Sequence, residues 1–207
     1  SEKEYAIKSK IKDGINNFII NNGVSNKIKK SFSNNIHKEL TIISVARFVK
    51  QKNIHEILEI ALKLPKYKFI IIGNGLLSKE INHFIIKKNL KNVNLLGERK
   101  DIFKYLYASD IYLSTSLYEG LPISILEAMS VGVPIVASNV IGNCDTIEHG
   151  KSGFLYKLND INKAVYYLEK LAVNLNLRKE IGGSAFERQR KLFSEQKMIS
   201  NHLNLYI

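Results

Sequence analysis

Short apolar runs alternate with helical patterns along most of the chain after residue 39. Runs rich in Ile, Val and Leu predict buried strands, because the inner strands of a parallel sheet are covered on both faces. The predicted strands are residues 40–45, 68–72, 93–96, 111–114 and 134–137, with a short sixth strand at 154–156.

Between the strands, apolar residues recur every three or four positions, which predicts helices with one buried face. Residues suited to helix starts precede several of these stripes: Asn53, followed by Glu56 three positions later, then Asp101 and Pro122. The predicted helices are residues 54–62, 77–88, 102–109, 122–131, 161–174, 177–183 and one within 194–205.

This alternation indicates an α/β fold: a Rossmann-like, doubly wound parallel sheet flanked by helices. In such sheets, ligands bind beyond the carboxyl ends of the strands. Polar residues and glycines gather at those ends, and we therefore expect the site there. They are Arg47 and residues 73–75, 97–99, 116–120 and 139–145.

Residues 1–38 do not fit the alternation. A lysine-rich, weakly amphipathic helix leads to an apolar stretch and an Asn-Gly turn, which alone cannot bury a core. We therefore read residues 1–38 as the end of a preceding domain and a linker, residues 39–190 as the main domain, and residues 191–207 as a C-terminal helix.

The formal net charge of the 207-residue chain is +12, from 31 basic and 19 acidic residues, which favours an anionic partner. Only five of the basic residues are arginine, the residue preferred for reading base edges, so we expect no nucleic acid partner. A solvated lysine-rich surface remains the alternative. The sequence has no long apolar run for a membrane span, a lone Cys144 that fits a reducing compartment, and five histidines without metal-binding spacing.

The most informative segment, SLYEGLPISILEAMSVG, covers residues 116–132. Glu119 follows a strand, Pro122 starts a helix, and Glu127 lies farther along that helix. Backbone N–H groups at a helix start form an anion site, so a phosphate can rest near Gly120–Ile123. Glu127 can then accept the hydroxyls of a ribose, and Glu119 those of a sugar beyond the phosphates.

Spacing alone does not establish this site. Glu187 and Glu195 have the same separation within a charged helical stretch, where we expect solvated side chains. Helix capping and simple surface exposure remain the alternative for Glu119 and Glu127. Only this pair occurs together with a preceding strand, and with a glycine and a helix-starting proline between its two members.

Arg47 and Lys52 follow the first strand with four residues between them, so two cations can converge on a diphosphate and neutralise it as a leaving group. Two solvated loop cations are the alternative. Gly73-Asn74-Gly75 lacks the third glycine of a dinucleotide fingerprint, which argues against NAD.

Together, these motifs resemble those of glycosyltransferase family 4, the GT-B enzymes that retain anomeric configuration. The motifs that carry the resemblance are Arg47-x4-Lys52, Gly73-Asn74-Gly75, Gly97-x3-Asp101 and the segment beginning at residue 116. The similarity covers residues 17–190 and is to the C-terminal, nucleotide-sugar-binding half of the GT-B fold.

The resemblance implies a role for each matching residue. Arg47 and Lys52 would hold the donor diphosphate, and Glu119 would touch the transferred sugar, which makes these three the catalytic candidates. Glu127 would bind the ribose. The other substrate-binding candidates implied are Gly73, Asn74, Arg99, Lys100, Gly120, Leu121, Pro122 and Ile123, with Arg99 and Lys100 beside the base.

The implied activity is transfer of a hexose from a UDP- or GDP-sugar to a glycan or lipid-linked acceptor, in bacterial surface polysaccharide or lipopolysaccharide synthesis. We expect no cofactor or metal, and a cytoplasmic location, with peripheral contact at the anionic inner face of the membrane as a further expectation. The family often carries Gly-Gly-x-x-Glu after the fifth strand, where this chain has Ile141 to Asp145.

Family members also carry an N-terminal acceptor domain, of which this chain holds at most the last helix. The final helix, with Phe193 and Leu203, is expected to cross back to it. Two alternatives stay open: a nucleotide-sugar-binding module or split-enzyme half without turnover of its own, and a basic protein that binds nucleic acid or membrane.

Overall fold

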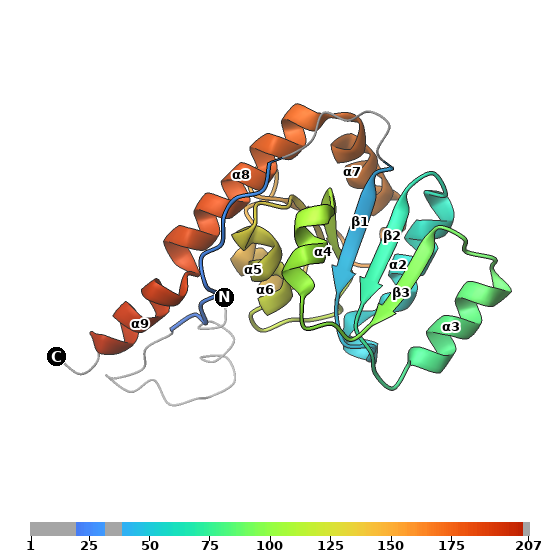
Figure 1. Ribbon diagram of the computed structural model, residues 1–207, viewed down its shortest axis with the longest axis horizontal. Coiled ribbons are helices and arrows are strands. Elements are labelled where there is room, and N and C mark those ends of the chain that lie inside the picture. The colour runs from blue at the N-terminus through green and yellow to red at the C-terminus, as the bar shows by residue number, and fades with distance from the viewer. Residues whose placement is uncertain (1–19, 32–38, 205–207) are drawn as a thin grey trace.

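A computed structural model describes residues 20–31 and 39–204, and Figure 1 shows its arrangement. Parallel strands form one six-stranded sheet in the order β3-β2-β1-β4-β5-β6. This is the order of a doubly wound sheet, with the topological switch between β1 and β4, so the predicted fold class is confirmed. The strands are β1 (Thr41–Val45), β2 (Lys68–Ile72), β3 (Val93–Gly97), β4 (Ile111–Ser114), β5 (Ile135–Ser138) and β6 (Phe154–Tyr156).

Helices cover both faces of the sheet, because successive side chains of each buried strand point to opposite sides. Ile42 packs in a cluster with α2 and α7, whereas Ile43 packs in a second cluster with α4 and α5. The helices are the 3₁₀ helix η1 (Lys50–Lys52), α2 (Ile54–Lys63), α3 (Ser78–Lys87), α4 (Ile102–Ala108), α5 (Ile123–Ser130), α6 (Ile141–Thr146), α7 (Ile161–Val173), α8 (Leu175–Leu192) and α9 (Glu195–Leu203).

Two predicted helix starts differ in detail. Asn53 precedes α2, but its backbone is left-handed (φ 48°) and its side chain does not cap the helix. Instead, the side-chain amide of Asn53 donates to the Glu56 carboxylate. Pro122 stands at the N-cap position, so α5 begins at Ile123, one residue later than predicted. The start of α2 was therefore located correctly but without the expected cap, and the start of α5 was located to within one residue.

Two regions were predicted wrongly. Residues 177–183 were expected to form a short helix, but α8 continues to Leu192 because its glycines are packing positions. A Cβ on Gly182 would lie 2.2 Å from the carbonyl oxygen of Gly132, so the glycine allows close contact with the α5–β5 turn. No helix was predicted between residues 137 and 154, but residues 141–146 form α6, in which the Thr146 hydroxyl donates to the Gly142 carbonyl (2.8 Å).

The segment 20–31 runs alongside α8, as the dark blue coil in Figure 1 shows. The Val24 amide donates to the carbonyl of Phe193 (2.9 Å), and the Glu195 amide donates to Val24 (3.2 Å). The Lys30 amide donates to Val131 beyond α5 (2.9 Å). This segment is therefore packed against the main domain. The helix predicted before residue 20 lies outside the described residues, and the boundary placed after residue 190 falls within α8.

Candidate functional site

Glu119 lies in the loop after β4, at the carboxyl edge of the sheet. The Lys52 ammonium donates to Glu119 Oε1 (2.5 Å), and the Ser116 hydroxyl donates to the same oxygen (2.6 Å). The Glu119 side chain is only 8% exposed. Among the described residues, its other oxygen, Oε2, accepts no hydrogen bond, so the carboxylate is fixed in place with one oxygen available to a ligand hydroxyl.

The backbone of this loop is held by the segment that follows β1. The Thr115 hydroxyl lies 3.0 Å from the carbonyl oxygens of Lys52 and Asn53. The Leu117 amide donates to the Gln51 carbonyl (2.8 Å). These bonds join the ends of β1 and β4 across the switch point, and they explain why Lys52 and Glu119 meet although 67 residues separate them.

On its other side the loop is held by α6. The Gly142 amide donates to the Glu119 carbonyl (3.2 Å). A Cβ on Gly142 would lie 1.9 Å from the carbonyl oxygen of Gly120, a distance that real Cβ atoms do not show. Glycine at this position is therefore what allows α6 to approach the Glu119–Gly120 backbone.

The N-terminus of α5 faces the same edge. Within the described part of the chain, the amides of Gly120, Leu121 and Ile123 donate to no acceptor. Helix N-termini carry partial positive charge, and unpaired N–H groups there bind anions. These amides were predicted from the sequence as a phosphate site, and the structure leaves them available for one.

Glu127 lies one turn into α5 and is half-buried, and burial raises the pKa of its carboxyl. The Tyr112 hydroxyl donates to the Val45 carbonyl (3.1 Å). The pKa of Tyr112 is raised by burial first and then by the charges of Glu127 and Glu119. Both carboxylates thus contribute to the electrostatic environment of this one buried hydroxyl.

A pocket of about 310 Å³ opens at the ends of β1, β2 and β3. Arg47, Gly73, Asn74 and Arg99 contribute to its lining, whereas Lys100 does not. Gly73 has φ 141°, and a Cβ there would lie 1.8 Å from the Ala46 carbonyl oxygen, so only glycine fits between the ends of β1 and β2. Lys52 does not line this pocket, and its ammonium is bonded to Glu119.

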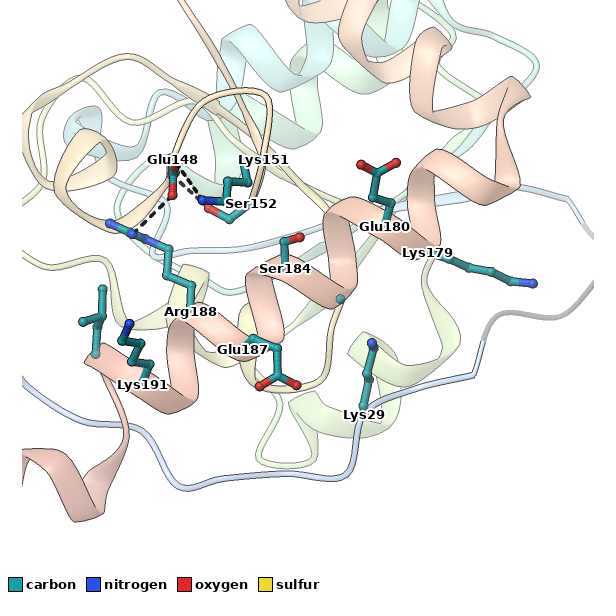
Figure 2. Close-up of a pocket in the computed structure, with 12 residues that line it drawn as sticks. Lys29, Glu148, Lys151, Ser152, Lys179, Glu180, Ser184, Glu187, Arg188 and Lys191 are labelled. Carbon is teal, nitrogen blue, oxygen red and sulfur yellow. Dashed lines mark hydrogen bonds and ion pairs between the residues drawn. The ribbon is translucent and has the colours of Figure 1, made fainter.

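The described residues line other pockets as well. One of about 450 Å³ lies between the Glu119 loop and α6. Another of about 570 Å³ runs along α8, where Figure 2 shows Arg188 pointing toward Glu148. The α8 pocket shares no lining residue with the pockets at the strand ends. In the described ranges, no group of three or more His, Cys, Asp or Glu side chains could hold a metal ion.

Sequence reasoning missed the residues that support the site. Ser116, Thr115 and Gly142 position Glu119 through side-chain and backbone contacts. Single serines, threonines and glycines in loops carry no spacing signal. The expectation that Glu187 and Glu195 are solvated is confirmed, since both residues are exposed.

A doubly wound parallel sheet with two carboxylates, a lysine and an open helix N-terminus at its carboxyl edge defines an α/β domain suited to an anionic, hydroxyl-rich ligand. Comparison with known proteins narrows the class. The family model of the glycosyl transferases group 1 matches residues 26–188. The chain belongs to this family, which confirms the family predicted from the motifs.

The chain is also similar to individual glycosyltransferases. Over 203 residues the chain is 32% identical to the poly(ribitol-phosphate) alpha-N-acetylglucosaminyltransferase of Staphylococcus aureus, covering 94% of this chain and 41% of that protein. Over 110 residues it is 39% identical to the UDP-Gal:alpha-D-GlcNAc-diphosphoundecaprenol alpha-1,3-galactosyltransferase of Escherichia coli, covering 52% of this chain and 28% of that one.

Among solved structures, a variant of S. aureus TarM in complex with fondaparinux, alpha-GlcNAc-glycerol and UDP matches all of this chain and 42% of its own, with 31% identity and a TM-score of 0.88. The chain thus spans less than half the length of these three relatives. No helix in the described part of the chain is long and apolar enough to cross a membrane.

Proposed function

We propose that this chain is the donor-binding part of a retaining glycosyltransferase that moves a hexose from a nucleotide diphosphate sugar to a glycan or lipid-linked acceptor. The observation that carries the proposal is the meeting of Lys52 and Glu119 beside the open N-terminus of α5. The names of the relatives support it: one uses UDP-Gal, and the structure of another contains UDP. Their acceptors favour bacterial surface glycan synthesis.

In the proposed reaction, the diphosphate lies against the amides of Gly120, Leu121 and Ile123, with Arg47 and Lys52 as its cations. Cleavage of the bond between sugar and phosphate leaves added negative charge on the diphosphate. Preorganised N–H groups and a lysine stabilise that charge without having to reorganise. Lys52 has three N–H donors, so it can bind a phosphate oxygen while it keeps its bond to Glu119.

The remaining groups orient the donor. Glu119 Oε2 accepts a hydroxyl of the transferred sugar, and Glu127 accepts the ribose hydroxyls. The pocket lined by Arg47, Gly73 and Arg99 receives the nucleoside end. A carboxylate bonded to a hydroxyl forms a charge-assisted hydrogen bond, worth about 1.5–3 kcal/mol.

The proposal is tested by thermal-shift measurement with UDP, GDP, ADP and their sugars. A ligand at about 100 times its dissociation constant should stabilise the protein by about 2.7 kcal/mol. Inorganic diphosphate and the free nucleosides serve as controls for each half of the ligand. If no nucleotide raises the melting temperature, the chain has no donor site and the proposal is wrong.

A second candidate function is a nucleotide-sugar-binding module without turnover of its own, because the roles assigned above to Lys52, Glu119 and the amides at the start of α5 are all roles in donor binding. Release of UDP or GDP from the bound sugar nucleotide distinguishes the two. Binding with release supports an active transferase, whereas binding without release supports a module that depends on an acceptor-binding domain.

A further inference from the structure

Glu56 is a buried acid that the proposed reaction does not use. It lies in the first turn of α2 and is only 5% exposed. Its Oε1 accepts from the Tyr156 hydroxyl of β6 (2.8 Å), and its Oε2 accepts from the side-chain amide of Asn53 (2.8 Å). Each carboxylate oxygen therefore has a donor, and the side chain joins the start of α2 to the edge strand of the sheet.

A carboxylate at this position carries an energetic cost. Burial raises the pKa of the Glu56 carboxyl. Hydrogen bonds from Tyr156, Asn53 and the backbone of Asn159 oppose that increase but do not cancel it. An apolar side chain of the same size would cover the core without this cost. The hydrogen bonds of Glu56 therefore serve a purpose other than filling space, and one of its partners, Asn53, lies next to a residue of the site.

Asn53 has a left-handed backbone (φ 48°), a conformation that residues other than glycine seldom adopt and that the surroundings must therefore hold. It directly follows Lys52, the last residue of η1. The Thr115 hydroxyl lies 3.0 Å from the carbonyl oxygens of Lys52 and Asn53, so the backbone at this junction is tied to the end of β4. The Asn53 side chain is fixed in turn by its bond to Glu56.

This junction sets the direction in which the Lys52 side chain leaves the backbone. That side chain is 16% exposed, and its ammonium donates to Glu119 (2.5 Å). A functional side chain keeps a precise position only when the residues around it lock the backbone that carries it. Because the left-handed turn at Asn53 follows immediately, a change of that turn moves Lys52 and draws its ammonium away from the Glu119 carboxylate.

We propose that Glu56 is a positioning residue that acts through Asn53 to hold Lys52 against Glu119. The inference rests on the proposed function, in which Lys52 is a cation of the donor diphosphate. Glu56 itself touches neither donor nor acceptor, and it orders the lysine before a ligand binds. Loss of the Glu56 carboxylate should therefore weaken binding of the diphosphate, and should do so only through Lys52.

The reactivity of the Lys52 amine reports its position without any ligand. The protein is treated with a limiting amount of acetic anhydride, and acetylation of each lysine is followed by mass spectrometry. Glu56→Met replaces the carboxylate by an unbranched apolar side chain that adapts to the same space. Lys52 acetylation should then rise several-fold, because the ammonium is released from Glu119 and reaches solvent.

Two controls separate this effect from general loosening of the fold. Glu59→Met changes another glutamate of α2 and should leave Lys52 acetylation as it was. Lys30 is 9% exposed and its ammonium donates to the Ser109 carbonyl after α4, so its acetylation reports on the fold elsewhere. If Glu56→Met leaves Lys52 acetylation unchanged, or raises that of Lys30 equally, the inference is wrong.

A second variant tests the route through Asn53. Glycine adopts the left-handed conformation easily, so Asn53→Gly removes the amide bonded to Glu56 while the turn itself can still form. Lys52 acetylation should rise as it does in Glu56→Met, and the two changes together should raise it no further. An unchanged rate in Asn53→Gly would show that Glu56 does not act through Asn53 and would overturn the inference.

Calorimetric titration of UDP and GDP completes the test. Glu56→Met should weaken binding about tenfold in the original chain but less than about twofold in the Lys52→Ala background, where the lysine through which it acts is missing. An equal loss in both backgrounds would show a general effect on the fold and refute the inference. If the original chain binds neither nucleotide while Glu56→Met still raises Lys52 acetylation, the proposed function fails and the positioning of Lys52 by Glu56 stands.

Discussion

Replacement of Gly142 by alanine should disturb the site through one atom. Gly142 lies in α6, where alanine is intrinsically the better helix former, so any loss must come from contact rather than propensity. The added Cβ would lie 1.9 Å from the Gly120 carbonyl oxygen and 2.9 Å from the Glu119 carbonyl carbon. Both neighbours are backbone atoms, which cannot rotate away.

The size of the effect follows from these distances. The contact with Gly120 falls 1.1 Å short of the 3.0 Å below which Cβ contacts essentially never occur. Either α6 or the Glu119–Gly120 backbone must therefore move by about 1 Å or more, and overpacking of this kind costs about 1–3 kcal/mol. A shift of the loop also displaces the amides proposed to bind phosphate, with the loss of at least one charge-assisted hydrogen bond, about 1.5–3 kcal/mol.

The assay combines thermal unfolding with calorimetric titration of UDP or GDP, whichever binds. We expect the Gly142→Ala variant to melt lower by about 2–4 °C for each kcal/mol lost, and to bind the nucleotide about tenfold more weakly or worse. Gly183→Ala is the matched control, because this helical glycine in α8 faces only the flexible end of Lys29. That variant should melt at the same temperature or higher and bind normally.

The reasoning is refuted if Gly142→Ala melts and binds as the original chain does. A lower melting temperature with unchanged nucleotide affinity would show that α6 moves and the loop does not. In that case Gly142 serves folding and does not position the proposed phosphate site.

Arg47→Ala and Lys52→Ala should each weaken nucleoside diphosphate binding by about 1.5–3 kcal/mol but leave nucleoside binding unchanged, as measured by calorimetry; equal losses for both ligands would indicate a damaged fold. Glu127→Gln should weaken ribonucleotide binding by about the same amount and 2′-deoxynucleotide binding less, whereas the exposed Glu195→Gln should change either by under about 0.5 kcal/mol. Burial raises the pKa of Glu56 above its ordinary value of 4.5. Between the unfolded and the folded pKa, the folded state therefore holds a proton on Glu56 that the unfolded state has lost, and the free energy of unfolding should fall as pH rises through this range. In Glu56→Gln this slope should disappear from denaturant titrations, and its persistence would exclude Glu56 as the source.

The strands were predictable from the sequence because their signal is local. Runs such as residues 68–72 are apolar and β-branched, and β2 has the predicted bounds. Their alternation with helices also determines the parallel topology, since few connections satisfy both short loops and right-handed crossovers. The positions of Glu119, Gly120 and Glu127 relative to a strand end and a helix start followed in the same way.

Contacts between distant segments were not predictable, because they depend on backbones that meet only in the folded chain. The glycines of α8 looked like a helix end, yet Gly182 packs against Gly132, and burial outweighed helix propensity. Residues 141–146 carry no helical periodicity, but their contacts with Glu119 and Arg188 form α6 and one wall of a pocket. Lys52 appeared in the sequence as a loop cation, and only the approach of β1 and β4 at the switch point made it the partner of a carboxylate.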